Sequence, residues 1–160
     1  MTFIAGPYTW TFNSNSLGIM EDAPALEHTN AGANISGDNL GDSIQDSVYR
    51  GGNLFVNVVL QEWDLTACQE AFAPWATAGD KGLVGQPGKL FSSWAAPLIG
   101  TVVTGTTATP ALVNFKKAVI APGFSVQQLL GTRLRQLPIR FLILPYADAS
   151  GVNRWYQYVS

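Results

Sequence analysis

The sequence predicts a mainly β fold, a sandwich or barrel with one short flanking α-helix at about 64–75 and one long loop at 37–53. Three observations support this fold class. Short segments alternate apolar and polar residues with the period of two that half-buried strands show. The 16 Gly and 9 Pro residues, with many Ser, Thr and Asn, indicate frequent turns. Only one segment repeats its apolar residues at helical spacing.

Length and composition indicate one globular domain spanning residues 1–160. A chain of this size can bury roughly 68–70% of its unfolded surface, and its hydrophobic content of 47% is too high for a disordered protein. No apolar run approaches the ~18 residues of a membrane span, and the first residues lack signal-peptide features. The single Cys68 excludes an internal disulfide and fits a reducing cytoplasm. Because no segment is long and apolar enough to span a membrane, we expect no membrane partner.

The first strand is predicted at 8–13, where three aromatic side chains share one face. Turn residues follow at 13–16, and residues 17–20 are expected to return as the hairpin partner. A weaker strand region is predicted at 21–36. The aromatic residues of the first strand are Tyr8, Trp10 and Phe12.

Residues 37–53 are predicted to form a long loop because Gly, Asp, Asn and Ser dominate the segment. Loops longer than about 12 residues are uncommon in compact domains unless they are functional or disordered. This segment also contains apolar side chains that a solvated loop seldom carries. We therefore expect it to dock on a partner through Leu40, Ile44, Val48 and Tyr49, with Arg50 beside them.

The strongest strand prediction is 54–62, and the only helix prediction follows it. Asp64 suits an N-cap, and Pro74 limits the helix to about three turns. Its apolar stripe consists of Leu65, Cys68, Phe72 and Trp75. Further strands are predicted at 89–94, 97–104, 112–121, 125–130, 137–144 and 155–159.

Charge is divided between the two halves of the chain. Residues 1–80 hold ten of the eleven acids and one base, Arg50, which gives a net charge of −9. Residues 81–160 hold eight bases and Asp148, which gives +7. Charged residues make up only 12% of the chain, against about 25% in ordinary domains. Either the two halves neutralise each other within one domain, or copies of the chain cover each other's surface.

The sequence predicts neither a catalytic site nor a cofactor. His28 is the only histidine, and Cys68 lies on the apolar stripe of the predicted helix. No phosphate loop, nucleophile elbow or dinucleotide fingerprint is present. Glu62 and Asp64 resemble an acid/base pair but lie where a strand passes into a capped helix.

A metal site is not predicted either. Asp38, Asp42 and Asp46 are spaced four apart, unlike the acids of an EF-hand loop. A calcium site that forms only when the loop folds stays an alternative to ordinary turn chemistry. The net charge of −2, without a basic cluster, argues against tight binding of nucleic acid.

Four stretches of the sequence together span nearly the whole chain, although none is a chemical motif. They are IAGPYTW at 4–10 with LG at 17–18 and ED at 21–22; GD at 41–42 with Asp46, VYRGGN at 48–53 and LQEW at 60–63; GQPG at 85–88 with Leu90; and RQLPIR at 135–140 with LPY at 144–146 and RWY at 154–156. In this order they resemble the tail-tube-type (major tail) virion proteins of tailed bacteriophages.

This resemblance implies a structural virion protein and no enzyme. It implies hexameric rings that assemble in the bacterial host cytoplasm and stack into the tail tube, a channel through which DNA passes without tight binding. A long loop in such proteins typically reaches a neighbouring ring. Partners would be copies of the chain and other tail proteins, such as a terminator, a baseplate or tip component, a sheath or a tape measure.

An acidic lumen would fit a DNA channel, because basic walls would hold the phosphates. The candidate lumen acids are Glu21, Asp22, Glu27, Asp38, Asp42 and Asp46. Three alternatives remain: another tail, baseplate or capsid-decorating β module; a sugar-binding β domain that uses exposed aromatic residues; and a hydrolase built on Glu62 and Asp64.

Overall fold

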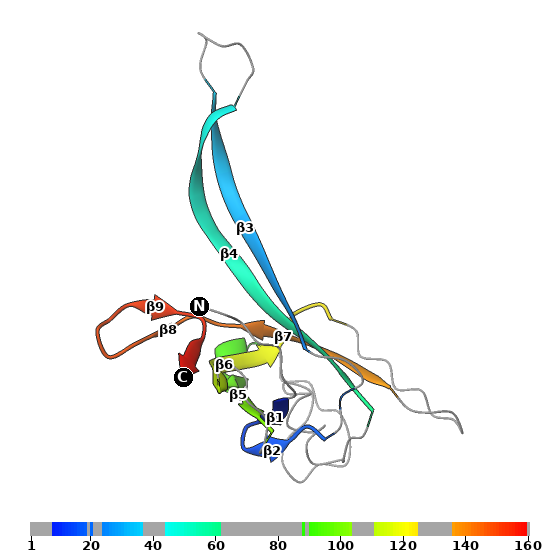
Figure 1. Cartoon of the computed structure of the whole chain (residues 1–160). Helices are drawn as coiled ribbons and strands as arrows, with labels where there is room; N and C mark the ends of the chain where they lie inside the picture. Colours follow the sequence, from blue (N-terminus) through cyan, green and yellow to red (C-terminus); the bar gives the residue numbers. More distant parts are fainter. Residues whose placement is uncertain are drawn as a thin grey trace.

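The computed structural model describes residues 8–18, 20, 24–36, 44–61, 88, 90–103, 111–124 and 136–159. Within these ranges the chain is mainly β, as predicted, and its helical content is one 3-10 turn, η2 (Phe91–Trp94) (Figure 1). The strands are β1 (Tyr8–Phe12), β2 (Asn15–Ser16), β3 (Ala25–Ser36), β4 (Ile44–Leu60), β5 (Ala96–Val102), β6 (Leu112–Ile120), β7 (Leu137–Ile143), β8 (Tyr146–Ala147), β9 (Asn153–Arg154) and β10 (Gln157–Val159).

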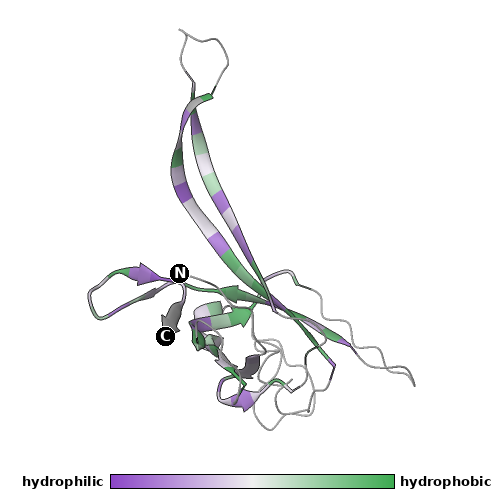
Figure 2. Ribbon diagram, viewed as in Figure 1, coloured by the Kyte–Doolittle hydropathy of each residue, from purple (hydrophilic) through white to green (hydrophobic). Residues whose placement is uncertain are grey.

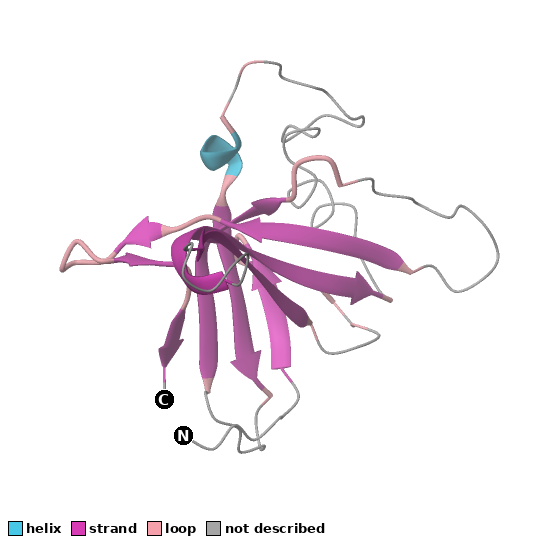
Figure 3. Cartoon of the chain, turned by 90° about the horizontal axis from the view of Figure 1, so that it is seen from above, coloured by secondary structure: helices cyan, strands magenta, loops and turns pink. Residues whose placement is uncertain are grey.

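Eight strands of the described chain form one antiparallel sheet (Figure 3). Their order is β2-β1-β5-β6-β7-β4-β3, and β10 pairs with β6 outside this path. β8 and β9 pair separately as a small hairpin. Because the path ends at β2 on one side and at β3 on the other, the sheet is not a closed barrel.

The large sheet folds over on itself in the manner of a sandwich. The rings of Phe12 on β1 and Phe141 on β7 have centroids 5.1 Å apart. In a flat sheet, three strand spacings would separate these strands by roughly 14 Å. An isolated bridge between Met20 and Leu60 also brings the chain after β2 back to β4. The curvature therefore encloses one core between the β1 side and the β4–β7 side.

The core confirms the faces that alternation predicts for the central strands. Every second residue of β7, and of β4 from Leu54 onward, points inward and is at most 2% exposed. Fully burying one such aliphatic side chain contributes about 1.5–3 kcal/mol relative to leaving it exposed. From these two strands the core residues are Leu54, Val56, Val58, Leu60, Leu137, Ile139, Phe141 and Ile143.

The predicted long loop at 37–53 is wrong from Ile44 onward, because residues 44–53 belong to β4. They pair with β3 in an antiparallel ladder that runs from Ser36 and Ile44 to Ala25 and Asn57 and has two register shifts. Backbone hydrogen bonds to β3 hold this segment extended, although its glycines and polar residues are typical of loops. Residues 37–43 lie outside the described residues.

Two smaller predictions also need correction. The segment 89–94 was expected to be a strand, but residues 91–94 form η2, where the Ser93 amide and hydroxyl both donate to the Leu90 carbonyl. The first hairpin returns earlier than predicted, at β2, because Asn13 and Ser14 adopt positive φ in a tight turn. The predicted helix at 64–75 and strand at 125–130 lie outside the described residues.

Candidate assembly surface

A two-stranded hairpin projects beyond the sheet, and we call it the arm (Figure 1). It consists of residues 29–36 of β3 and residues 44–53 of β4. At the usual rise per residue, the ten residues from β4 span roughly 33 Å. β7 pairs with β4 only over Leu54–Leu60, so no other described strand flanks the arm.

Both edges of the arm are therefore unpaired among the described strands. β3 ends the sheet, and its twelve residues contain no Lys, Arg or Pro and only one charged side chain, Glu27. Natural proteins usually protect an exposed edge strand with Lys, Pro or other charged residues, because a free edge is a template on which another chain can pair. A lone two-stranded hairpin is marginally stable in water. These features are typical of a segment that gains a partner.

Hydrophilic and hydrophobic residues are interspersed along both strands of the arm (Figure 2), so its two faces carry different side chains. The cross-strand pairs Ala33–Val48 and Ile35–Asp46 lie on one face, because side chains alternate along a strand. Ile35 is 46% exposed and Val48 is 53% exposed. We call Ala33, Ile35, Asp46 and Val48 the apolar arm face.

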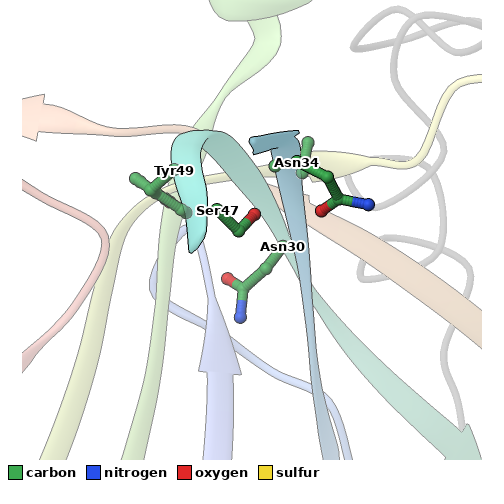
Figure 4. Close-up of a pocket in the computed structure, with 6 residues that line it drawn as sticks. Asn30, Asn34, Ser47 and Tyr49 are labelled. Carbon is green, nitrogen blue, oxygen red and sulfur yellow. The ribbon is translucent and has the colours of Figure 1, made fainter. Parts of the chain in front are cut away.

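The opposite face of the arm is polar and holds a shallow open hollow of about 440 Å³ (Figure 4). Two amides, a hydroxyl and a phenol contribute to it, with Ala31 and Gly32 between them. The polar lining residues are Asn30, Asn34, Ser47 and Tyr49.

At the base of the arm, two side chains and a backbone carbonyl pack over a glycine beside an irregularity in the pairing. The register shifts between Ala31 and Gly32, and Gly51 opposite has a φ of 127°. A Cβ on Gly52 would lie 2.4 Å from the Thr29 carbonyl oxygen and 3.2 Å from both His28 Nε2 and the Tyr49 hydroxyl. The His28 ring also meets Trp155 edge-on, with centroids 6.4 Å apart. The arm is thus tied to the C-terminal strands through its base.

Glu27, a candidate lumen acid, forms an ion pair with Arg140, a base that is distant in the sequence. Arg140 Nη2 lies 2.9 Å from Glu27 Oε1, and Asn57 Nδ2 donates to Glu27 Oε2 at 3.3 Å. The guanidinium of Arg140 also lies 4.1 Å from the centre of the Phe55 ring. Alternation in β7 places Arg140 opposite the core face, but its partner is 113 residues away and could not be predicted.

Most of the predicted docking residues are exposed to solvent, although they lie in a strand and not in the predicted loop. Ile44, Val48, Tyr49 and Arg50 are exposed residues of β4. Asp46 lies on the apolar arm face, where its Oδ1 accepts a hydrogen bond from the Ser47 amide at 2.7 Å. The remaining predicted residues lie outside the described residues: Leu40, Glu21, Asp22, Asp38 and Asp42.

Sequence reasoning did not identify a second surface, which we call the basic corner: Lys116, Lys117 and Arg154. The register between β5 and β6 shifts at Lys116 and Lys117, so that both protrude as a bulge and are exposed. Lys116 Nζ lies 4.7 Å from the centre of the Tyr146 ring, and Tyr146 pairs across the β8–β9 hairpin with Arg154. Arg154 in turn forms an ion pair with Asp148.

The hydrogen bonds of Asp148 hold the β8–β9 turn together. Its Oδ1 accepts the amides of Ser150 at 2.8 Å and Val152 at 3.0 Å, while Oδ2 accepts from Arg154 Nε. The Arg154 hydrogen bond is the largest cause that lowers the pKa of Asp148 below its ordinary value.

The described residues contain no group of three His, Cys, Asp or Glu side chains placed to hold a metal ion. They also contain no helix with the length and apolar character needed to cross a membrane. No protein-family model matches the chain, and no curated protein sequence matches it. The function must therefore be argued from the arm, its two faces and the basic corner.

Proposed function

We propose that this chain is a structural virion protein of a tailed bacteriophage, which assembles with itself into stacked, hexameric rings of the tail tube. The tube is a channel for genome delivery, and it forms in the host cytoplasm before it joins the virion. The observation that carries the proposal is the arm: a long hairpin with two unpaired edges and an exposed apolar face. The resemblance in the sequence supplies the class of assembly.

Exposed apolar side chains support a partner for the arm. Five large hydrophobic residues of β3 and β4 are between 46% and 62% exposed. Four of them lie on the projecting arm and Leu26 lies below it on β3. Exposed groups of this kind mark an interaction surface. An arm that binds a different surface of the next copy makes a head-to-tail contact, which closes into a ring or continues as a filament. The five residues are Leu26, Ile35, Ile44, Val48 and Tyr49.

Electron microscopy of an arm-shortened variant tests the proposal. Residues 33–48 are replaced by Asn-Gly, a favoured two-residue hairpin turn. The core lies below the cut, so circular dichroism and thermal unfolding should stay close to those of the wild type. Wild-type protein should form rings or tubes in negative stain, and the shortened variant should stay monomeric. A wild-type protein that light scattering shows as monomer at every concentration in low salt would contradict the proposal.

The hollow on the polar arm face favours one second candidate, a sugar-binding domain. Asn30 and Asn34 offer amides, Ser47 a hydroxyl, and Tyr49 an aromatic ring that is 58% exposed. These groups can hydrogen-bond sugar hydroxyls and stack on a sugar ring. NMR titration with soluble oligosaccharides checks this candidate: binding should shift the side-chain amides of Asn30 and Asn34, and Asn34→Ala should weaken it. Unchanged amide signals would exclude the hollow as a sugar site.

A further inference from the structure

Apart from Leu90, the exposed large hydrophobic residues of the described chain gather in two places. One group lies on β3 and β4, where Ile35 and Val48 form part of the apolar arm face. The other lies beside the basic corner, where Val152 is 52% exposed and Tyr156 is 38% exposed. The Tyr156 ring meets Phe115 edge-on at 6.1 Å, which places it next to the Lys116–Lys117 bulge.

The two places carry opposite charge. The four residues of the apolar arm face include one acid, Asp46, and no base, and the exposed Arg50 lies at the register shift at the base of the arm. The bulge holds two exposed ammonium groups, Lys116 and Lys117, whereas Arg154 is already paired with Asp148. Within one copy the arm and the β8–β9 hairpin project in different directions (Figure 1), so the two surfaces do not face each other.

We infer that the apolar arm face of one copy docks on the basic corner of a second copy, with the Asp46 carboxylate opposite Lys117. This inference rests on the proposed self-assembly and names the surface that receives the arm. Burial of Ile35 and Val48 against Val152 and Tyr156 supplies attraction, while the charge pair steers the encounter and fixes the register. The two surfaces differ, so each copy receives one arm and donates another.

A charge-swap experiment tests the inference. Asp46→Lys and Lys117→Glu should each slow assembly about tenfold at low salt, because like charges then face each other. Combining both changes in one chain should restore most of the wild-type rate, as followed by light scattering. Ser36→Lys is the matched control: Ser36 alternates with Asn34 on the polar face near the same end of the arm, and the added positive charge should leave the rate nearly unchanged.

A cross-link supplies a second measurement that does not depend on assembly rate. In a Cys68→Ser background, which removes the native thiol, chains with Asp46→Cys are mixed with chains carrying Lys117→Cys and oxidised. Mixed dimers should form that neither variant forms alone. If wild-type protein assembles but the charge reversals have no effect and no mixed dimer forms, the arm docks elsewhere and this inference is overturned. If wild-type protein does not assemble at all, both the proposed function and this inference fail. Assembly of the wild-type protein therefore distinguishes failure of the inference alone from failure of the proposed function.

Discussion

At the scale of single residues, Asp148 shows how one carboxylate can order a turn. It accepts hydrogen bonds from two backbone amides and one guanidinium, all within six residues of the chain. These donors favour the charged form, so the pKa of Asp148 is lower in the folded protein than in the unfolded chain. The resulting stabilisation is complete above the unfolded pKa, about 4, and is lost as the pH falls through the lower folded pKa.

We therefore expect the β8–β9 hairpin to loosen in acid before the core does. Hydrogen exchange of the Val152 amide, corrected for the intrinsic pH dependence, should show a loss of protection as the pH falls below about 4. Asp148→Asn should remove this pH dependence, because the amide side chain does not titrate. Equal profiles for the two proteins would show that the carboxylate does not hold the turn.

The Glu27–Arg140 contact marks the limit of residue-level prediction from sequence. Alternation around Ile139 and Phe141 is enough to place Arg140 on the face away from the core. The identity of its partner depends on which strands are neighbours, and neighbours are set by the topology of the whole sheet. Glu27 therefore appeared unmatched in the sequence, although a base lies 2.9 Å away in the fold.

At the scale of elements, the core strands could be predicted and the arm could not. β1, β4 from Leu54 onward, and β7 bury every second residue, so burial is visible as alternation. Residues 44–53 are held by backbone pairing with β3, which leaves little pattern in the side chains. The apolar residues within them predict docking in either case, because exposure of Ile44 and Val48 is costly whether the backbone is loop or strand.

Gly52→Ala should destabilise the arm while leaving the core of the sheet intact. The new Cβ would meet the Thr29 carbonyl oxygen at 2.4 Å, and that backbone atom cannot move without breaking the pairing of β3 with β4. We expect a loss of about 1–3 kcal/mol in unfolding free energy. Amides of the arm should lose hydrogen-exchange protection while the core keeps it. Protection in the arm that equals the wild type would show that the strands adapt to the methyl group.

At the scale of the whole molecule, the division of charge predicts that the proposed self-assembly depends on salt. The Debye length falls from about 10 Å at 0.1 M to about 3 Å at 1 M salt. Assembly from monomer should slow as salt rises, since steering between the arm and the basic corner weakens. Finished tubes should persist, because apolar burial does not depend on charge. Light scattering after salt jumps in both directions checks this prediction, and an assembly rate that is independent of salt would contradict it.

Two of the candidate lumen acids have other partners: Glu27 forms an ion pair with Arg140, and we infer that Asp46 faces Lys117 of a second copy. Glu27 is neutralised by Arg140, and a lysine there would place two cations together on the sheet. Glu21 and Asp22 lie outside the described residues, so their place in a ring stays a prediction. In a hexameric tube, every lumen-facing acid is repeated around a narrow channel whose walls focus the field.

Changing Glu21 and Asp22 to Lys should therefore convert a tube that repels DNA into one that binds it. Folding should change by less than about 0.5 kcal/mol if both side chains are exposed. The assembled variant should retain DNA in a sedimentation assay, with an affinity that falls steeply as salt rises. The neutral variant with Gln at 21 and Asn at 22 is the control, because it removes repulsion without adding attraction. If the lysine tube leaves DNA in solution at low salt, these acids do not line the lumen, and the assembly proposal stands or fails on the arm.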